Sequence, residues 1–580
     1  MAPLLLKFPR LSLIPRVSRA VTLAPTTRQH RCCYMYSFST SSSVAAADSE
    51  SSSKKTSSKS KRRPKRSVPI SGLNLSKTAN SAVDGSFLLT DEGKDFGAFT
   101  AAEALNESTA RNQYSDILVQ LQAQNQGANV SLFYKQNGGV VATRGQGAHI
   151  FQDPQFSRTG NKAPFLDIAN NVAGVGHSHP LVVQASVAEM TNIQTNARFL
   201  HPKRTAYVSK LLTTLPSTLD TFFFCNSGSE ANDLALRIAK AYAKSKKRGG
   251  KPVPKFPDDV VVLDVAYHGH TQAVVDISPY KWRQCTDGEN YHKEHIHVVS
   301  MPDTYRGPHR GHTEASGKKY AKEVAAVIKK LGGGVGAFIH ESVMGCGGQI
   351  VMPPAYLQTV YDTVRRHGGI VIADEVQTGF ARSGSHFWMF ESYDVVPDIV
   401  TMGKPMGNGY PMAGVAVGRE IANAFSDSGI EYFNTYAGNS VACAIGDAVL
   451  EAIELDKLQQ NAFEIGKELR SRLLELQSRY PCMGDVRGVG LFLGVEFIKT
   501  DTGTEGADGN VASADILPNG ELCKFVVDFL RYKRIIASRD GPDGNVLKIK
   551  PPLVFSQDNV NQLMTTLEEA ISVAVKSGRF

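Results

Sequence analysis

Cysteines and long apolar runs are scarce in this 580-residue chain. Eight cysteines are scattered along it, only Cys32 and Cys33 are adjacent, and no CxxC spacing occurs. The pattern gives no support to a zinc site or a redox dithiol and is compatible with a reducing compartment. Because no apolar run of membrane-spanning length follows the first 66 residues, the sequence predicts a soluble mature protein without a membrane partner.

Acidic residues are absent from positions 1–47, which carry six Lys or Arg residues and run into the serine-rich stretch SFSTSSS. This composition is typical of an organelle transit peptide, and it predicts a mitochondrial matrix protein. The next stretch, SSSKKTSSKSKRRPKRS, is too polar to bury a core and is interpreted as a disordered linker, with a nuclear signal as the alternative.

The net charge of +9 belongs to this leader. Residues 1–66 hold 14 basic and 2 acidic side chains, which leaves 50 basic against 53 acidic residues in the rest of the chain. The body is therefore slightly acidic, at about −3, and no nucleic-acid partner is predicted for it.

From about residue 220, short apolar strands alternate with stretches of helical period, which predicts a mostly parallel sheet with helices on both faces. Ligands in such folds bind beyond the carboxyl ends of the strands. Four strand ends therefore decide the functional interpretation.

The first strand end lies in TFFFCNSGSEAN, where Phe222–Phe224 is followed by Ser227, Gly228 and Ser229 at the start of an amphipathic helix. Free backbone N–H groups, the helix dipole and two hydroxyls make this turn suitable for binding phosphate. An ordinary N-cap, for which one serine suffices, is the alternative.

The second strand end lies in DDVVVLDVAYHGHT, where Val260–Leu263 is followed by Tyr267 and His268. An aromatic ring at this place can stack on a flat heterocycle, and the glycine that follows allows close backbone approach. A core aromatic beside a surface histidine is the alternative.

The third strand end lies in GGIVIADEVQTGFARSG, where Ile370–Ala373 is followed by Asp374, Glu375 and Gln377. A buried aspartate can keep a pyridine nitrogen protonated, and a glutamine can reach a ring hydroxyl. A metal site is the alternative, but no histidine cluster accompanies the acidic pair, and no metal is predicted.

The fourth strand end lies in DIVTMGKPMGNG and carries Lys404. A lone lysine is usually solvated, with its stem covering apolar surface. In an apolar pocket, however, its amine is a nucleophile that can hold a carbonyl cofactor as a Schiff base. Phosphate cradle, aromatic plate, acid and amine together match an aldehyde-bearing phosphorylated pyridine, and the predicted cofactor is pyridoxal 5'-phosphate.

The same residues resemble those of class III, fold type I pyridoxal-phosphate aminotransferases. The similarity covers roughly residues 95–575 and rests on NSGSEAN, AYHGHT, IADEVQTGFARSG, TMGKPMGNG and NTYAGNSVACA, which occur in the family's order. It implies an α/β fold with a large domain built on a mostly parallel sheet and a smaller α+β C-terminal domain. The expected divisions are 1–70 for transit peptide and linker, 71–164 for an N-terminal segment, 165–420 for the large cofactor-binding domain and 421–580 for the small domain.

The resemblance also implies a role for individual residues. Lys404 would bind the cofactor and shuttle the proton, and Asp374 would pair with the pyridine nitrogen. Thr435, in the TYAGN motif, would reach the phosphate of a neighbouring subunit's cofactor, which implies a homodimer or homotetramer with shared active sites. The remaining implied contacts are Gln377 with the ring hydroxyl, Gly228 and Ser229 with the phosphate, Tyr267 stacked on the ring and His268 beside it.

Within the class, the chain is most similar to a group that contains alanine–glyoxylate aminotransferase 2-like proteins and the ethanolamine-phosphate and phosphohydroxylysine phospho-lyases. Many transaminases of the class have an arginine before the C-terminal PPL segment, whereas this chain reads LKIKPPL with Lys548 at that place. A lysine suits phosphate as well as carboxylate. The alternative is that Lys548 is solvated and Lys550 or Arg306 meets the substrate anion.

The resemblance implies an enzyme that acts on a small primary amine. The expected reaction is elimination of phosphate and ammonia from phosphoethanolamine or phosphohydroxylysine. A transaminase moving an amino group from alanine or an ω-amine to glyoxylate or pyruvate is the alternative, and a non-catalytic binding protein is a remote one.

Overall fold

A computed structural model describes residues 130–134, 139–152, 163–285, 293–500 and 516–578, with isolated positions from 122 to 126. The predicted transit peptide and basic linker lie outside the described residues, as does much of the predicted N-terminal segment.

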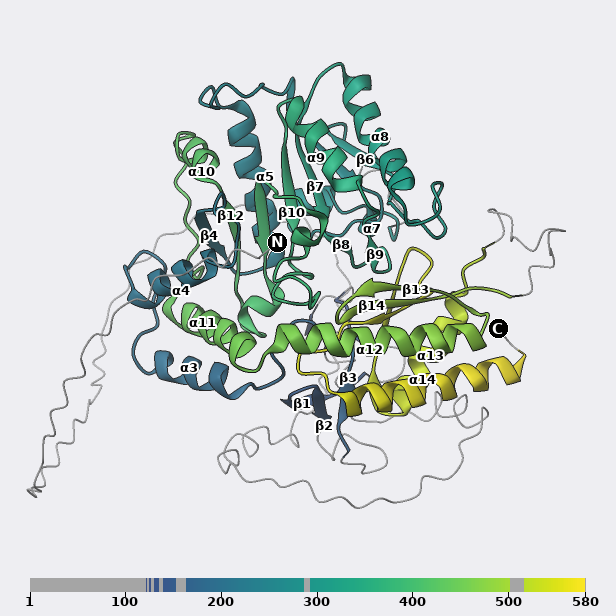
Figure 1. The fold of residues 1–580 in the computed structure, drawn as a ribbon. Coiled ribbons are helices and arrows are strands. Elements are labelled where there is room, and N and C mark those ends of the chain that lie inside the picture. Colours follow the sequence, from purple (N-terminus) through teal and green to yellow (C-terminus); the bar gives the residue numbers. More distant parts are fainter. Residues whose placement is uncertain are drawn as a thin grey trace, which may run out of the picture. The chain divides into compact units, whose positions relative to one another are not determined.

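A seven-stranded sheet forms the centre of the large part of the fold (Figure 1). Six of its strands, β4, β11, β10, β7, β5 and β6, run in the same direction, whereas β12 is antiparallel to both of its neighbours, β11 and β4. The prediction of a mostly parallel sheet is thus confirmed. In spatial order the strands are β4 (Thr221–Cys225), β12 (Ala413–Val417), β11 (Ile399–Met402), β10 (Ile370–Asp374), β7 (Val335–Glu341), β5 (Phe256–Leu263) and β6 (Ile296–Val299).

Both faces of this sheet are buried, which explains why its strands are continuous apolar runs rather than alternating ones. In β5, Val261 and Leu263 belong to one apolar cluster, while Val260 and Val262 belong to the cluster on the other face. Helices cover both faces: α5 (Gly228–Lys244), α6 (Gln272–Asp276), α7 (Pro279–Trp282), α8 (Glu314–Leu331), α9 (Tyr356–Arg366) and α10 (Arg419–Ser426).

Helix α11 (Ser440–Leu455) is buried over most of its length and packs against α3 (Pro180–Met190) and α4 (Pro202–Leu212). The short elements of this half of the chain are β8 (Val343–Met344), β9 (Ile350–Val351) and the 3₁₀ turns η4 (Met389–Tyr393) and η5 (Lys404–Gly407).

The C-terminal part has a four-stranded antiparallel sheet in the order β13-β14-β17-β16, with helices α12 to α14 beside it (Figure 1). A second sheet, β1-β2-β3-β15, joins strands from both ends of the described chain, because β3 pairs in parallel with β15. The bounds are β1 (Ala142–Gln146), β2 (His149–Gln152), β3 (Phe165–Asp167), α12 (Leu458–Arg479), β13 (Met483–Val489), β14 (Phe492–Phe497), α13 (Gly520–Tyr532), β15 (Ile535–Ile536), β16 (Ser538–Asp540), β17 (Val546–Ile549) and α14 (Gln557–Ser577).

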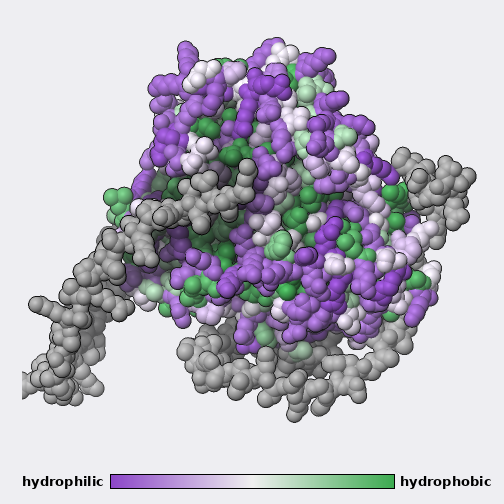
Figure 2. Space-filling model, in the orientation of Figure 1, coloured by the Kyte–Doolittle hydropathy of each residue, from purple (hydrophilic) through white to green (hydrophobic). Residues whose placement is uncertain are grey.

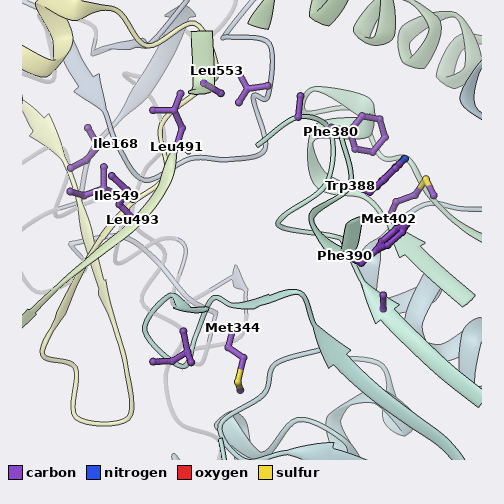
Figure 3. Packing of buried hydrophobic residues seen from close by; sticks show 14 of the residues in the cluster. Ile168, Met344, Phe380, Trp388, Phe390, Met402, Leu491, Leu493, Ile549 and Leu553 are labelled. Atoms are coloured by element: carbon purple, nitrogen blue, oxygen red, sulfur yellow. The ribbon is translucent and has the colours of Figure 1, made fainter. Parts of the chain in front are cut away.

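The largest apolar cluster extends from the big sheet into this C-terminal part. Figure 3 shows Ile549 of β17 close to Leu493 of β14, and Trp388 close to Phe380. The Trp388 and Phe380 rings meet edge to face with 5.1 Å between centroids. Hydrophilic residues cover most of the face drawn in Figure 2. None of the helices in the described ranges has both the length and the apolar character needed to cross a membrane.

Candidate active site

A cavity of about 330 Å³ lies at the carboxyl ends of β4, β5, β10 and β11. Parallel strands place their carboxyl ends along one edge of a sheet, so stretches far apart in the sequence meet there. The cavity brings together seven of the nine predicted site residues, and Thr435 and Lys548 are not among the residues that line it. The seven are Gly228, Ser229, Tyr267, His268, Asp374, Gln377 and Lys404.

One wall of the cavity is the N-terminus of α5. Ser227 is the N-cap, with its hydroxyl accepting the Glu230 N–H at 3.2 Å. A side chain at position 228 would place its Cβ 2.6 Å from Val376 Cγ1, so only glycine leaves this wall open. The first-turn N–H groups of a helix have no intrahelical acceptor, and together with the dipole they favour an anion here.

The loop after β5 crosses directly over this helix start. Ser229 Oγ accepts the His270 N–H at 3.0 Å. Gly269 has a φ of +136°, and a Cβ there would lie 2.8 Å from Ser229 Cα. The close approach therefore requires glycine, and it holds the predicted aromatic segment beside the phosphate cradle.

Asp374, the last residue of β10, lies on the cavity floor and is 5% exposed. Its Oδ2 accepts hydrogen bonds from Asn232 Nδ2 and from His268 Nδ1, both at 2.8 Å, and its Oδ1 accepts the Val376 N–H at 3.0 Å. A carboxylate offers about four acceptor positions, so Oδ1 retains room for one more donor from the cavity.

Asn232 is a site residue that the sequence reasoning missed. Its amide also donates to the His268 carbonyl at 2.8 Å, and its Oδ1 accepts the Thr401 hydroxyl at 2.7 Å. It is almost fully buried on the inner face of α5. A buried-face asparagine on an otherwise apolar stripe was the available signal, because a buried amide must find partners.

Tyr267 and His268 have different surroundings. Tyr267 lines the cavity, and its ring meets those of His270 and Tyr280 edge to face. Burial raises the pKa of its hydroxyl to about 12. The His268 side chain is fully buried, and its Nδ1 forms a hydrogen bond with Asp374, so His268 helps to fix the orientation of the carboxylate.

Lys404 follows β11 and is partly buried in the cavity wall. Its φ of +38° is a left-handed conformation, held by the turn in which Asn408 accepts the Val175 N–H at 3.1 Å and donates to the Gly176 carbonyl at 2.9 Å. Within the described chain the Lys404 amine makes no hydrogen bond or ion pair. Burial lowers the pKa of this amine, which favours its neutral, nucleophilic form.

Two glutamates near the cavity point in different directions. Glu341, which the sequence reasoning did not single out, lines the cavity and accepts the backbone N–H groups of Tyr267 and Gly345. Burial raises its pKa to about 7. Glu375 points away from the cavity, where it accepts the Thr378 hydroxyl at 2.7 Å and the Phe390 N–H at 2.8 Å, and so it ties down the loop after β10.

The lysine that directly follows β17 contacts the cavity residue Gln377, and a second lysine lies within β17 itself. Lys550 Nζ donates to Gln377 Oε1 at 3.0 Å. Lys548 is paired with Asp540 of β16, at 2.7 Å between Nζ and Oδ2, and is not a freely solvated side chain. Arg306, the other alternative for a substrate anion, is engaged with Glu496 and Asp543.

Thr435 lies apart from the other predicted residues. Its side chain is exposed, and its carbonyl accepts the Ala197 N–H at 3.2 Å. Its predicted contact is with a neighbouring subunit's cofactor, and that contact stays a prediction.

The residues of the cavity fit pyridoxal phosphate. The α5 N-terminus suits its phosphate, the open acceptor position on Asp374 suits a protonated ring nitrogen, and the amine of Lys404 suits its aldehyde. Gly228 lets the start of α5 lie close to Val376, another residue of the cavity wall, since a Cβ there would lie 2.6 Å from Val376 Cγ1.

Comparison with known proteins identifies several relatives. The model of the class III aminotransferase family matches residues 136–571. The chain is 40% identical to an alanine–glyoxylate aminotransferase 2-like protein of Drosophila melanogaster over 82% of this chain and 91% of that protein. It is 36% identical to ethanolamine-phosphate phospho-lyase homolog 1 of Caenorhabditis elegans, over 82% and 98%.

Among solved structures, a phospholyase from Arthrobacter in complex with phosphoethanolamine is 32% identical. It aligns with a TM-score of 0.68 over 79% of this chain and 99% of that one. Two further relatives, from Arabidopsis thaliana and Homo sapiens, have names that place them in mitochondria.

Proposed function

The chain belongs to the class III aminotransferase family and is a pyridoxal-phosphate-dependent enzyme, and from this premise we propose that it is a phospho-lyase. The family predicted from the motifs is confirmed. The proposed substrate is an O-phosphorylated amino alcohol such as phosphoethanolamine or phosphohydroxylysine. The observation that carries the proposal is the buried Lys550, whose amine bonds the cavity residue Gln377, together with Lys548 two residues before it, because these amines can receive a second anion in addition to the cofactor phosphate.

Lys404 is the proposed proton carrier. When bound, pyridoxal phosphate withdraws electrons from the carbon that bears the substrate amine, which makes a proton on that carbon acidic. The neutral Nζ of Lys404 takes this proton, because burial disfavours the charged amine and no protein acceptor occupies it in the described chain. Lys404 is thus assigned both cofactor binding and proton transfer.

Asp374 is proposed to hold a proton on the ring nitrogen. Asn232 and His268 donate to Oδ2 and keep the carboxylate in one orientation, so that Oδ1, which accepts the Val376 N–H, keeps a further acceptor position free. A preorganised buried carboxylate stabilises positive charge on the nitrogen without reorganisation of solvent.

The elimination balances with water as the only co-reactant. The C–O bond to phosphate breaks, and the phosphate leaves with the bonding electron pair. One phosphoethanolamine and one water give acetaldehyde, inorganic phosphate and ammonia, and no amino acceptor is consumed.

Two further proposals concern the assembly and its location. We propose a homodimer or homotetramer in which Thr435 serves the neighbouring subunit's site. Exposed apolar side chains on α3, in the loop before α4 and beside Thr435 support an interface there, and Leu200 is 99% exposed. A mitochondrial location is proposed from the leader composition and from the two relatives named as mitochondrial.

The test uses protein lacking residues 1–66, incubated with phosphoethanolamine or phosphohydroxylysine and no keto acid. We expect inorganic phosphate and ammonia in equal amounts, and neither from the Lys404→Ala variant. The alternative, a transaminase, is favoured by the naming of the Drosophila relative. Absence of phosphate release, together with amino transfer from alanine or an ω-amine to glyoxylate or pyruvate, would establish it.

A further inference from the structure

The two lysines of the LKIKPPL stretch project from the same face of the chain. Ile549, between them, is fully buried in the main apolar cluster (Figure 3). Neighbouring side chains of an extended strand point to opposite faces, so Lys548 and Lys550 both point away from that core. Gly494 is opposite Lys548 in the register of β14 and β17 and adds no side chain there.

The charges of the two lysines are matched differently. Lys548 forms its ion pair with Asp540, whose side chain is itself 6% exposed. Lys550 is 8% exposed, and among the described residues its side-chain amine has a single hydrogen bond, to the neutral amide oxygen of Gln377. No ion pair to Lys550 exists within the described residues.

A buried amine without a counter-charge is unfavourable, and proteins rarely contain one without a reason. Burial and the nearby Lys548 lower the pKa of Lys550 well below its ordinary value. The Cys346 thiol, which lies close enough to influence Lys550, is held protonated because burial raises its pKa to about 12. None of the residues that the structure describes therefore supplies a free anion for Lys550.

The position of Lys550 suits an anion that arrives with the substrate. Gln377 lines the cavity, so the amine that bonds its oxygen lies at the cavity edge, and an ammonium group has two further N–H donors. The cofactor phosphate is assigned to the start of α5, beyond Asp374. The Lys550 amine is therefore available to a different anionic group.

We propose that Lys550 is the residue that binds the phosphate group of the substrate, while Asp540 holds Lys548 and partly neutralises it. This inference rests on the proposed function, because it assigns the substrate phosphate of that same reaction. An arriving phosphate dianion supplies the missing counter-charge, so Lys550 becomes a charged donor when the substrate is bound. The roles of the two lysines are thereby separated: Lys550 binds the phosphate directly, and Lys548 is a positioning residue.

The experiment titrates the holoenzyme with phosphoethanolamine, with ethanolamine and with β-alanine, which carries a carboxylate in place of phosphate. The apparent Kd is read from the visible absorbance of the bound cofactor. Wild type is compared with Lys550→Met, Lys550→Arg and Lys548→Met. Binding of inorganic phosphate is measured separately, as the rise it causes in the melting temperature of each holoenzyme.

We expect Lys550→Met to raise the apparent Kd for phosphoethanolamine by roughly thirtyfold or more, since a buried charge partner is lost. The apparent Kd for ethanolamine should change by less than about threefold in this variant. Lys550→Arg should retain part of the preference for phosphoethanolamine over ethanolamine. Lys548→Met should raise the apparent Kd for phosphoethanolamine less than Lys550→Met does. Inorganic phosphate should raise the melting temperature of wild type and not that of Lys550→Met.

Three outcomes would overturn the inference. One is an unchanged preference for phosphoethanolamine over ethanolamine in Lys550→Met. Another is a larger loss of affinity for phosphoethanolamine in Lys548→Met than in Lys550→Met. A third is weaker binding of β-alanine by Lys550→Met with unchanged binding of phosphoethanolamine, which would show that Lys550 binds a carboxylate and not a phosphate.

Failure of the proposed function is recognised separately. Wild type would then release no phosphate from phosphoethanolamine, whatever the variants do. Stabilisation by inorganic phosphate that requires Lys550 would still support an anion site at this residue, and its absence in wild type would overturn that site as well. The cofactor absorbance of each variant shows whether the loss of the Gln377 contact has disturbed cofactor binding.

Discussion

The two ends of the active-site region offer positive charge to an anion in different ways. At the cofactor end, made by Gly228, Ser229 and the start of α5, the donors are backbone N–H groups and a helix dipole. At the lysine end, made by Lys548, Lys550 and Asp540, the donors are lysine amines, and one of them, that of Lys548, is already paired. A helix dipole carries no net charge and needs no counter-ion, whereas a buried charged amine needs one. Only the lysine end is therefore expected to change its protonation when an anion binds there.

The largest effect is expected where the two ends meet, at Lys404. Lys404→Ala removes the amine that we propose binds the cofactor and moves the proton, and turnover should fall at least about 10³-fold. Released phosphate measures the loss. Cofactor fixed covalently by borohydride should disappear in this variant and remain in Lys550→Met. Retention of more than a tenth of wild-type turnover would refute the assignment.

The next effect sharpens the cofactor end. Asp374→Asn should retain bound cofactor and reduce turnover about 10²-fold to 10³-fold, because the amide cannot hold a proton on the ring nitrogen. Glu375→Gln is the matched control: this neighbouring carboxylate points away from the cavity, so its loss should lower stability and leave turnover within a fewfold of wild type. Equal losses in the two variants would contradict the distinction.

A smaller effect tests the backbone of the cofactor end. Gly269→Ala places a Cβ 2.8 Å from Ser229 Cα at a φ of +136° and should weaken cofactor binding about tenfold. Cofactor Kd is measured by equilibrium dialysis of the apoenzyme. Gly429→Ala has a positive φ of 78° with no atom near its Cβ, so it should carry backbone strain alone and leave the Kd unchanged.

The smallest effect concerns stability at the lysine end. Because burial depresses the pKa of Lys550 in the folded state, the unfolded state binds more protons, and wild-type stability rises with pH toward the ordinary value of 10.5. Lys550→Met removes this cost and should stabilise the protein at neutral pH on the order of 1 kcal/mol. The gain should shrink as the pH rises toward 10.5, as measured by denaturant titration.

The groups that face Lys550 are Lys548, Asp540, Lys404 and Cys346, and each influences this titration. Asp540→Asn is therefore a useful comparison, because it leaves Lys548 unpaired and should depress stability at neutral pH. A stability gain in Lys550→Met that grows with pH would contradict a buried neutral amine.

Much of the cofactor end was predictable because it is encoded in contiguous stretches. A strand followed by a glycine-serine turn and an amphipathic helix indicates where Ser229 lies, and an apolar strand ending in Asp374 indicates a buried carboxylate. Asn232 was missed because its role depends on Asp374, His268 and Thr401, which lie on three other segments of the chain. Helical spacing alone places it on a buried face and says nothing of its partners.

The lysine end depends more on contacts between distant strands, which the sequence alone does not reveal. Position and charge suggested Lys548 as the anion-binding residue, but only the pairing of β16 with β17 brings Asp540 within 2.7 Å of it. The same pairing leaves Lys550 with a neutral partner. Sequence reports which residues carry charge, but a counter-charge from another strand decides how much of that charge is available.

The sequence by itself therefore determined the family, the α/β fold and the order of the cofactor motifs, and it led to the proposal that Lys404 binds the cofactor, because local patterns dictate strands, turns and helix starts. Tertiary structure alone decided which polar groups became partners: Asn232 with Asp374, Gln377 with Lys550, and Asp540 with Lys548. The physical reason is that hydrogen bonds and ion pairs act over a few ångströms, and strands distant in sequence reach that range only when the sheets are assembled.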